Sequence, residues 1–452
     1  MALISRKQVK PDSMTGSDRT SLAENSVVST MEAAIEETLE QEELERTQLG
    51  DYMKIFGGQA FSLVGSALVQ FALVWWLTYS TGSAIVLSLA TMMVILPQII
   101  VSPFAGALVD RWNRRRIMIS TDALSAAAVA VLALLWSLGV VEILHVFAAM
   151  AIRSTLGNFQ WPALQASASL MVPEEHLSRV NGMYQAISGM ARIAAPALGA
   201  LLLVFVPIHM VILIDIGTAG MAILPLLKIH VPRPTASKSD SIASGVTSEI
   251  REGFSYMKNW KGGSFITVAL MMANFVLIPT FSMTPLLVLF HFSGGAFELA
   301  LFESMMGVGM VLGGVTLGIW GGFKRRMLTS LVGLLVASAS IFVIGLAPPT
   351  MLVLAVVGVF VAGAMIPLAS GSIMAVVQSV VPPKIQGRVF TVLTSLGPVM
   401  TPIGLVIAGA VIEGLGIQAW YLLGGIILAI VGIAGGMNKS IKTLGEIKTD
   451  PQ

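Results

Sequence analysis

Four ionisable side chains interrupt long apolar runs, and they are the residues of this chain best placed to do chemistry: Arg153, Arg192, Asp215 and Glu303. A charge among apolar neighbours is costly to bury, so such a residue binds an ion, carries a proton or pairs with an opposite charge. The chain has no cysteine, its five histidines lack metal-ligand spacing, and no nucleophile lies beside a base. We therefore expect no metal, no cofactor and no enzymatic activity.

The composition places these charges in a membrane protein. Of the residues, 55% are hydrophobic and 12% are charged, whereas soluble domains carry about 25% charge. A helix needs about 20 apolar residues to cross the hydrocarbon core of a bilayer, and runs of this length follow one another along the chain. The runs are too long for the strands of a barrel, so we expect an all-α membrane protein.

We expect twelve membrane-spanning helices. The first six are predicted at 52–79, 83–109, 117–139, 143–169, 180–205 and 208–228, and the second six at 264–290, 297–320, 327–346, 350–380, 388–411 and 418–437. All but two of the 27 Lys and Arg residues fall in the tails and in the loops that share one side with them. The positive-inside rule places that side, and both termini, at the cytoplasmic face of the cell membrane.

The second six helices repeat the first six in the same direction. VPEEHLSRV at 172–180 matches VPPKIQGRV at 381–389 at its Val, Pro, Arg and Val positions, and Gly106 lies within one residue of the same offset from Gly314. Two parallel halves around a midplane site are a known transporter design. We accordingly expect a disordered acidic cytoplasmic tail (1–50) that could hold a short helix, an N-terminal half (51–229), a cytoplasmic linker (230–263), a C-terminal half (264–437) and a cytoplasmic tail (438–452).

The segment after the second helix, GALVDRWNRRR at 106–116, resembles the loop signature of the major facilitator superfamily. That signature reads Gly, three residues, Asp-Arg, one residue, usually Gly, and two basic residues; Asn113 stands at the second Gly. The resemblance covers residues 50–440 and implies the major facilitator fold. GQAFSLVGSALVQFALVWWL in the first helix and VPEEHLSRVNGM before the fifth are similar to the drug and macrolide efflux branch, which includes siderophore exporters.

The resemblance implies a conformational latch at the cytoplasmic side. In the superfamily, the Asp of the signature contacts the cytoplasmic start of the eleventh helix while the protein is open outward. The positive end of that helix dipole would suit a carboxylate, and the neighbouring cations would balance charge and bind lipid headgroups. The latch residues of this chain would be Gly106, Asp110, Arg111, Arg114, Arg115 and Arg388.

A substrate and proton pathway is expected in the N-terminal half. Arg153 lies about 15 Å below the outer edge of the fourth helix, in an Arg-x-x-x-Gly string similar to that of proton-coupled members. We expect it to bind an anionic group or to tune a carboxylate, with a structural Arg bonded to backbone carbonyls as the alternative. Asp215 is a candidate proton carrier or a structural ion partner. Gln59 and Gln70 are further pathway candidates, and Asp122 is assigned to the loop network.

Two more sets concern the contacts between helices. Arg192 and Glu303 lie at similar heights in the fifth and eighth helices, which pack across the halves in the superfamily. We expect an interdomain ion pair that breaks as the halves rock. The string APALGA resembles the Gly-Pro-x-x-Gly-Gly packing motif of exporters, with its counterparts at Ala195, Pro196, Gly199 and Ala200.

The sequence thus predicts a secondary active transporter that exports hydrophobic or amphipathic small molecules, drug-like or macrolide-like, by proton antiport. Its expected partners are the small-molecule substrate, protons and membrane lipids, without nucleic acid, and the chain is expected to be a monomer. Export of a siderophore or another endogenous metabolite, or transport of a lysophospholipid, is an alternative. A non-transporting membrane receptor or scaffold is the alternative from another class.

Overall fold

The computed structural model describes residues 16–232, 254–260, 262–438 and 441. This part of the chain is helical and contains no β-strand. Eleven of its helices are long and apolar enough to cross a membrane. Large apolar side chains such as Phe205, Ile319 and Val353 are exposed, which costs little in lipid because lipid tails are as apolar as they are. The expectation of an all-α membrane protein is confirmed.

The described N-terminal half follows the first six predicted spans. Ser83 caps the second helix, since its hydroxyl accepts the backbone N–H of Val86, and Asn113 caps the third through the N–H of Arg116. The six helices are α1 (Gly16–Thr81), α2 (Ala84–Arg111), α3 (Arg114–Ser137), α4 (Ile143–Met171), α5 (Glu174–Phe205) and α6 (Ile208–Lys228).

One of these helices, α4, is not among the eleven apolar ones. It is 29 residues long, or about 43 Å, so its length is sufficient to cross a bilayer. Arg153, Asn158 and Gln160 make it less apolar than the others. The count of twelve spans therefore stays a prediction, and the polar content of α4 is the first sign of a site inside this half.

Two spans of the described C-terminal half are interrupted. The span predicted at 264–290 forms α8 (Gly263–Ser282), the short α9 (Thr284–Leu286) and a π-helical turn, η2 (Leu287–His291). The span predicted at 388–411 breaks at Met400, which lies between two prolines that lack a backbone N–H. The two pieces together, Ile385–Leu415, form one of the eleven membrane-length helices. The remaining elements are α10 (Ala296–Trp320), α11 (Arg326–Leu346), α12 (Leu352–Val380), α13 (Pro383–Val399), α14 (Thr401–Leu415) and α15 (Ile417–Met437).

The repeated strings occupy equivalent places in the two halves. The first string begins α5, whose N-cap is Pro173, and the second begins α13, whose N-cap is Pro382. Gly106 belongs to α2 and Gly314 to α10, the second membrane helix of each half. The two halves therefore follow one another in the same direction, as the sequence repeat predicts.

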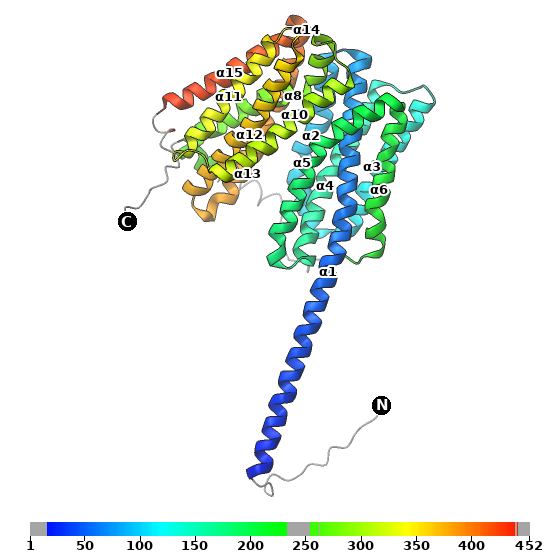
Figure 1. Cartoon of the computed structure of the whole chain (residues 1–452), viewed down its shortest axis with the longest axis vertical. Coiled ribbons are helices and arrows are strands. Elements are labelled where there is room, and N and C mark those ends of the chain that lie inside the picture. The colour runs from blue at the N-terminus through cyan, green and yellow to red at the C-terminus, as the bar shows by residue number, and fades with distance from the viewer. Residues whose placement is uncertain (1–15, 233–253, 261, 439–440, 442–452) are drawn as a thin grey trace.

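The N-terminal segment differs from the expected disordered tail. One continuous helix runs from Gly16 through the first span to Thr81, and Figure 1 shows α1 extending far beyond the bundle. The tail sequence MEAAIEETLEQEELE is rich in Ala, Glu and Leu. These are strong helix formers, so the helix can continue without tertiary contacts. Residues 1–15 lie outside the described part.

The predicted linker is described only at its two ends, because residues 233–253 lie outside the described part. Residues 254–259 are helical. Met257 is buried in one cluster with Ile266, Met327 and Ile441. The end of the linker and one residue of the C-terminal tail therefore pack onto the C-terminal half.

The two halves are joined at the end of the bundle where α2 begins and α14 ends. The Ser83 hydroxyl donates to the Glu413 carboxylate at 2.7 Å, and the Ser88 hydroxyl donates to the Leu405 carbonyl at 2.8 Å. In Figure 1 the ribbons of the halves lie together at this upper end and diverge toward the end from which α1 extends. The protein is therefore closed at the end of the bundle opposite the N-terminal segment.

A polar layer separates two buried apolar clusters in the N-terminal half. One cluster includes Leu73 and Leu132, and the other includes Phe56 and Met118. The polar residues of α1 in this layer, Gln59, Ser62, Ser66 and Gln70, lie between Phe56 and Leu73 along the helix. The layer between the clusters is where the candidate site is found.

Candidate functional site

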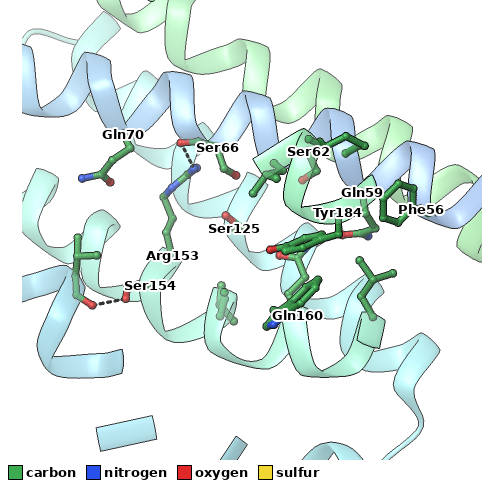
Figure 2. A pocket seen from close by; sticks show the side chains of 18 of the residues that line it. Phe56, Gln59, Ser62, Ser66, Gln70, Ser125, Arg153, Ser154, Gln160 and Tyr184 are labelled. Carbon is green, nitrogen blue, oxygen red and sulfur yellow. Dashed lines mark hydrogen bonds between the residues drawn. The ribbon is translucent and has the colours of Figure 1, made fainter. Parts of the chain in front are cut away.

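A cavity of about 310 Å³ lies within the N-terminal half. Its wall comes mainly from α1, α3, α4 and α5. Figure 2 shows the polar side chains that gather on it: Gln59, Ser62, Ser66, Gln70, Ser125, Arg153, Ser154, Gln160 and Tyr184. Three of the four expected pathway residues, Arg153, Gln59 and Gln70, therefore line one cavity.

Helix α1 presents its polar side chains to the cavity as a stripe. Gln59, Ser62, Ser66 and Gln70 follow at intervals of three or four residues, the spacing that returns a helix to the same face. The two glutamines were predicted as pathway residues, and the two serines were not. The helical period of the polar residues in the first span is the signal that would have found them.

The fourth expected pathway residue, Asp215 on α6, forms an ion pair with Arg153 on α4. The Arg153 side chain is 10% exposed and that of Asp215 is 3% exposed. The Ser66 hydroxyl donates to the second carboxylate oxygen of Asp215 at 3.1 Å. The Ser66 carbonyl accepts from Arg153 at 3.4 Å, as Figure 2 shows. Of the two expected roles of Asp215, this geometry fits the structural ion partner.

Asp122, on α3, accepts hydrogen bonds from three neutral side chains. Gln59 Nε2 lies 2.8 Å from Oδ2, while Ser62 Oγ and Gln160 Nε2 lie 3.2 Å and 2.6 Å from Oδ1. Gln160 Nε2 also donates to Gln59 Oε1 at 2.6 Å. Asp122 was expected in the loop network, but it lies about 12 Å along α3 from its first residue. That depth places it in the polar layer instead.

The cavity wall has an aromatic part as well. Trp161 and Tyr184 stack with ring centroids 3.5 Å apart and an interplanar angle of 24°, and Phe56 also lines the cavity. In Figure 2, Phe56 and Tyr184 lie near Gln160 and away from Arg153. Aromatic surface with a few placed polar groups is the usual lining of a small-molecule site.

The sequence from residue 55 to residue 400 matches the profile of the Major Facilitator Superfamily. The match begins in α1, ends at the break between α13 and α14, and includes the whole cavity wall. The chain belongs to the Major Facilitator Superfamily. The resemblance drawn from the loop signature is thereby confirmed.

Similar proteins in the superfamily include efflux proteins. The chain is 31% identical to macrolide efflux protein A of Streptococcus pyogenes over 393 residues, which are 87% of this chain and 97% of that protein. It is 27% identical to the multidrug efflux pump Tap of Mycolicibacterium fortuitum over 405 residues, 86% of this chain and 95% of that protein.

Solved structures agree with the superfamily fold. A bacterial homologue of the human lysosomal transporter Spinster, in an inward-facing and unoccupied conformation, superposes with a TM-score of 0.67. The two chains are 12% identical, and the alignment covers 89% of this chain and 99% of that one. At this identity the likeness concerns the fold alone.

The basic residues of the loop signature bind the carbonyl ends of other helices. Arg114 Nη1 lies 2.5 Å from the Ala166 carbonyl oxygen, in the last turns of α4. Arg115 donates to the carbonyls of Leu226 and Leu227 at the end of α6, the latter at 2.8 Å. The last carbonyls of a helix lack partners and favour a cation, which applies to Arg115 at the end of α6. Arg114 instead joins the start of α3 to the last part of α4.

The latch between Asp110 and the start of the eleventh span stays a prediction. The side chains of Gly106 and Asp110 lie outside the described part of the structure. Arg111 ends α2 and is exposed, and Arg388 is half-buried on α13. Because the halves are joined at the other end of the bundle, we predict the latch for a second conformation.

The expected partners Arg192 and Glu303 lie on α5 and α10, which meet across the halves. The Ser304 hydroxyl donates to the Ile193 carbonyl at 2.9 Å, so the residues next to both partners are in contact. Arg192 is exposed and Glu303 is half-buried. In the described structure the two form no ion pair. Their pairing stays a prediction for another state of the transport cycle.

The small residues of the packing motif lie at the contact between α5 and α1. All four are buried: Ala195, Pro196, Gly199 and Ala200. A Cβ atom added to Gly199 would lie 2.6 Å from Cδ1 of Phe71 on α1, which is closer than real Cβ atoms approach. Gly199 is thus needed for the close approach of these two helices.

Proposed function

We propose that this protein exports hydrophobic and amphipathic small molecules, macrolide-like compounds among them, in exchange for protons. The observation that carries the proposal is the cavity of the N-terminal half, which joins aromatic surface to a layer holding two buried aspartates, Asp122 and Asp215. The rings suit a bulky apolar substrate, and a carboxyl group at membrane depth can carry a proton. The similarity to efflux proteins over nearly their whole length supports export.

The substrate crosses the membrane by alternating access to this cavity. The distribution of Lys and Arg supports cytoplasmic termini, so the end closed by Ser83 and Glu413 faces outward and substrate enters from the cytoplasm. Rocking of the halves breaks that contact and closes the cytoplasmic end. A proton that binds from outside and leaves to the cytoplasm then drives the return of the empty protein.

The charges on the cavity wall bear on the substrate. Arg153 is the one charged residue among those described on the wall, and Asp215 already compensates it. An anionic group would therefore compete with a carboxylate for the guanidinium. This favours a neutral or cationic amphiphile over an anionic siderophore or a phosphate-bearing lipid.

The membrane location and the oligomeric state of the protein belong to the same proposal. The protein lies in the cytoplasmic membrane, with lipid against its exposed apolar side chains. It works as a monomer, because each chain contains both halves and its own cavity.

Accumulation of a radiolabelled macrolide in a pump-deficient bacterium tests the proposal. Cells that express the chain are expected to hold less macrolide than cells without it, and a protonophore is expected to abolish the difference. Asp110→Asn is compared with the wild type in the same assay. Because the variant loses the carboxylate of the predicted latch, it is expected to export less macrolide while its expression stays normal. Equal accumulation with and without the chain dismisses macrolide export, and export that withstands the protonophore dismisses proton coupling.

A further inference from the structure

A buried carboxylate with only neutral partners occupies the centre of the polar layer. Asp122 is 2% exposed, and its hydrogen bonds come from Gln59, Ser62 and Gln160. No ion pair of the described residues includes Asp122. An ionised carboxylate in such a place carries a charge that amide and hydroxyl dipoles alone must stabilise.

The second buried aspartate, Asp215, has a charged partner. Asp215 is equally buried but forms an ion pair with Arg153 and accepts from Ser66. A proton on Asp215 would leave the guanidinium without its counter-charge, which is costly at this depth. A proton on Asp122 would instead remove a charge that has no counter-ion. Of these two groups, Asp122 can change its protonation without breaking an ion pair.

The charged groups near Asp122 do not alter this comparison. The hydrogen-bond donors to Asp122 are Gln59 and Ser62 from α1 and Gln160 from α4, all of them neutral. Of the ionisable residues on α4 and α6, the helices that pack most against α3, Arg153 and Asp215 lie at membrane depth and neutralise each other, whereas His145, His209 and Lys228 lie at the ends of their helices.

The hydrogen bonds around Asp122 must reverse when it takes up a proton. As a carboxylate it only accepts, and both amide groups of Gln59 and Gln160 donate toward it. A protonated Asp122 has an O–H that needs an acceptor. If Gln59 turns its carbonyl oxygen toward this O–H, it loses that oxygen as the acceptor for Gln160, which must turn as well. Both amides line the cavity, so the wall changes its donors and acceptors with the proton.

We propose that Asp122 binds the transported proton and that the Gln59 and Gln160 amides transmit its protonation state to the substrate cavity. The proposal rests on proton-coupled export as the function of the cavity. One proton is bound at Asp122 when the cavity is empty and faces outward. The proton leaves toward the cytoplasm when substrate enters. Once Asp122 is ionised, the amides of Gln59 and Gln160 return to the orientation in which they donate toward it, and this is the arrangement of the cavity wall that binds the substrate.

Asp122→Asn in purified chain tests this role, since asparagine keeps the size of the side chain and imitates the protonated form. Three quantities are measured with a radiolabelled macrolide. They are uptake into acid-loaded proteoliposomes above the passive uptake of protein-free liposomes, exchange of labelled for unlabelled macrolide without a gradient, and proton release on binding in weakly buffered detergent. The variant is expected to lose gradient-driven uptake and proton release and to keep exchange within about two-fold.

Glu142→Gln is the matched control, because it removes a carboxylate at the N-cap of α4, outside the polar layer. It is expected to keep all three activities. Full gradient-driven uptake by Asp122→Asn overturns the proposal, and so does the joint loss of uptake and exchange in a folded variant. If Asp122→Asn does not fold, Asp122→Glu decides: a shifted pH profile of uptake supports the role, and an unchanged profile overturns it. A wild-type protein that ignores the gradient contradicts the proposed function itself.

Discussion

The stability of the N-terminal half depends on keeping both partners of the ion pair between Arg153 and Asp215. Both side chains are almost fully buried. Removal of one partner leaves the other charge uncompensated and costs about 3–5 kcal/mol, whereas replacement of both by apolar residues of similar size is often neutral. The stability of the pair and its role in transport can therefore be separated by mutation.

Asp215→Leu is expected to lower the free energy of unfolding by about 3–5 kcal/mol, because it strands the Arg153 guanidinium in the polar layer. The double variant Arg153→Met with Asp215→Leu is expected to recover most of that loss. Thermal unfolding of the purified proteins in detergent measures both effects. A single variant as stable as the wild type would contradict a buried, paired guanidinium.

The charged residues of the polar layer are recognisable in the sequence, but the partners of these residues are not. Arg153 and Asp215 stand out because they interrupt apolar runs, yet their pairing depends on how α4 and α6 pack, which no local pattern records. Asp122 was assigned to the loop because it lies near a predicted span end. Its hydrogen bonds to Gln59 and Gln160 join residues from three helices, and such a junction exists only in the folded protein.

The contact between α1 and α5 shows how single small residues set the distance between helices. The position of Gly199 leaves no room for a side chain beside Phe71. Gly182 on the same helix has no neighbouring atom within 4 Å of an added Cβ. The two glycines therefore form a matched pair for a test of the packing motif.

Gly199→Ala is expected to destabilise the protein by about 1–3 kcal/mol, the usual cost of overpacking, and Gly182→Ala is expected to be neutral. Phe71→Leu combined with Gly199→Ala should restore part of the loss, because the smaller side chain vacates the space. The melting temperatures of the purified variants give the comparison. Equal effects of the two alanine substitutions would mean that the contact with Phe71 does not limit the packing.

At the level of elements, hydropathy predicted where the helices lie but not how they end. The span edges agree within a few residues for most helices, since apolar runs and caps are local signals. The acidic segment was predicted as a disordered tail that could hold a short helix, whereas α1 is continuous from Gly16, because the residues of the segment favour helix. The break at Met400 was missed because prolines are common within membrane helices and only some of them interrupt one.

For the whole molecule, the contact between Ser83 and Glu413 stabilises the conformation in which the two halves are closed at this end of the bundle. The Glu413 carboxylate of the C-terminal half accepts from the Ser83 hydroxyl and from the backbone N–H of Ile85 at the start of α2. A carboxylate at a helix N-terminus is favourable. Because Glu413 is exposed, the contact is worth only about 1 kcal/mol, or about five-fold in an equilibrium constant.

Glu413→Ala is therefore expected to raise the population that is open at this end by up to about five-fold. The chain lacks cysteine, so Leu138→Cys and Leu415→Cys can be spin-labelled without further changes, and electron spin resonance measures the distance between the halves. Glu142→Ala, which removes a carboxylate at the N-cap position of α4, serves as the control. Identical distance distributions for both variants would show that Glu413 does not hold the halves together.

Proton-driven macrolide export is the central claim, and uptake into acid-loaded proteoliposomes that contain the purified chain tests it most directly. A gradient of one pH unit supports at most about tenfold accumulation in one-for-one exchange. We predict an initial rate of uptake several-fold above that of protein-free liposomes, whose rate measures the passive entry of a basic macrolide, and the loss of this excess rate when a protonophore dissipates the gradient. An initial rate equal to that of protein-free liposomes, or one indifferent to the gradient, would contradict the claim.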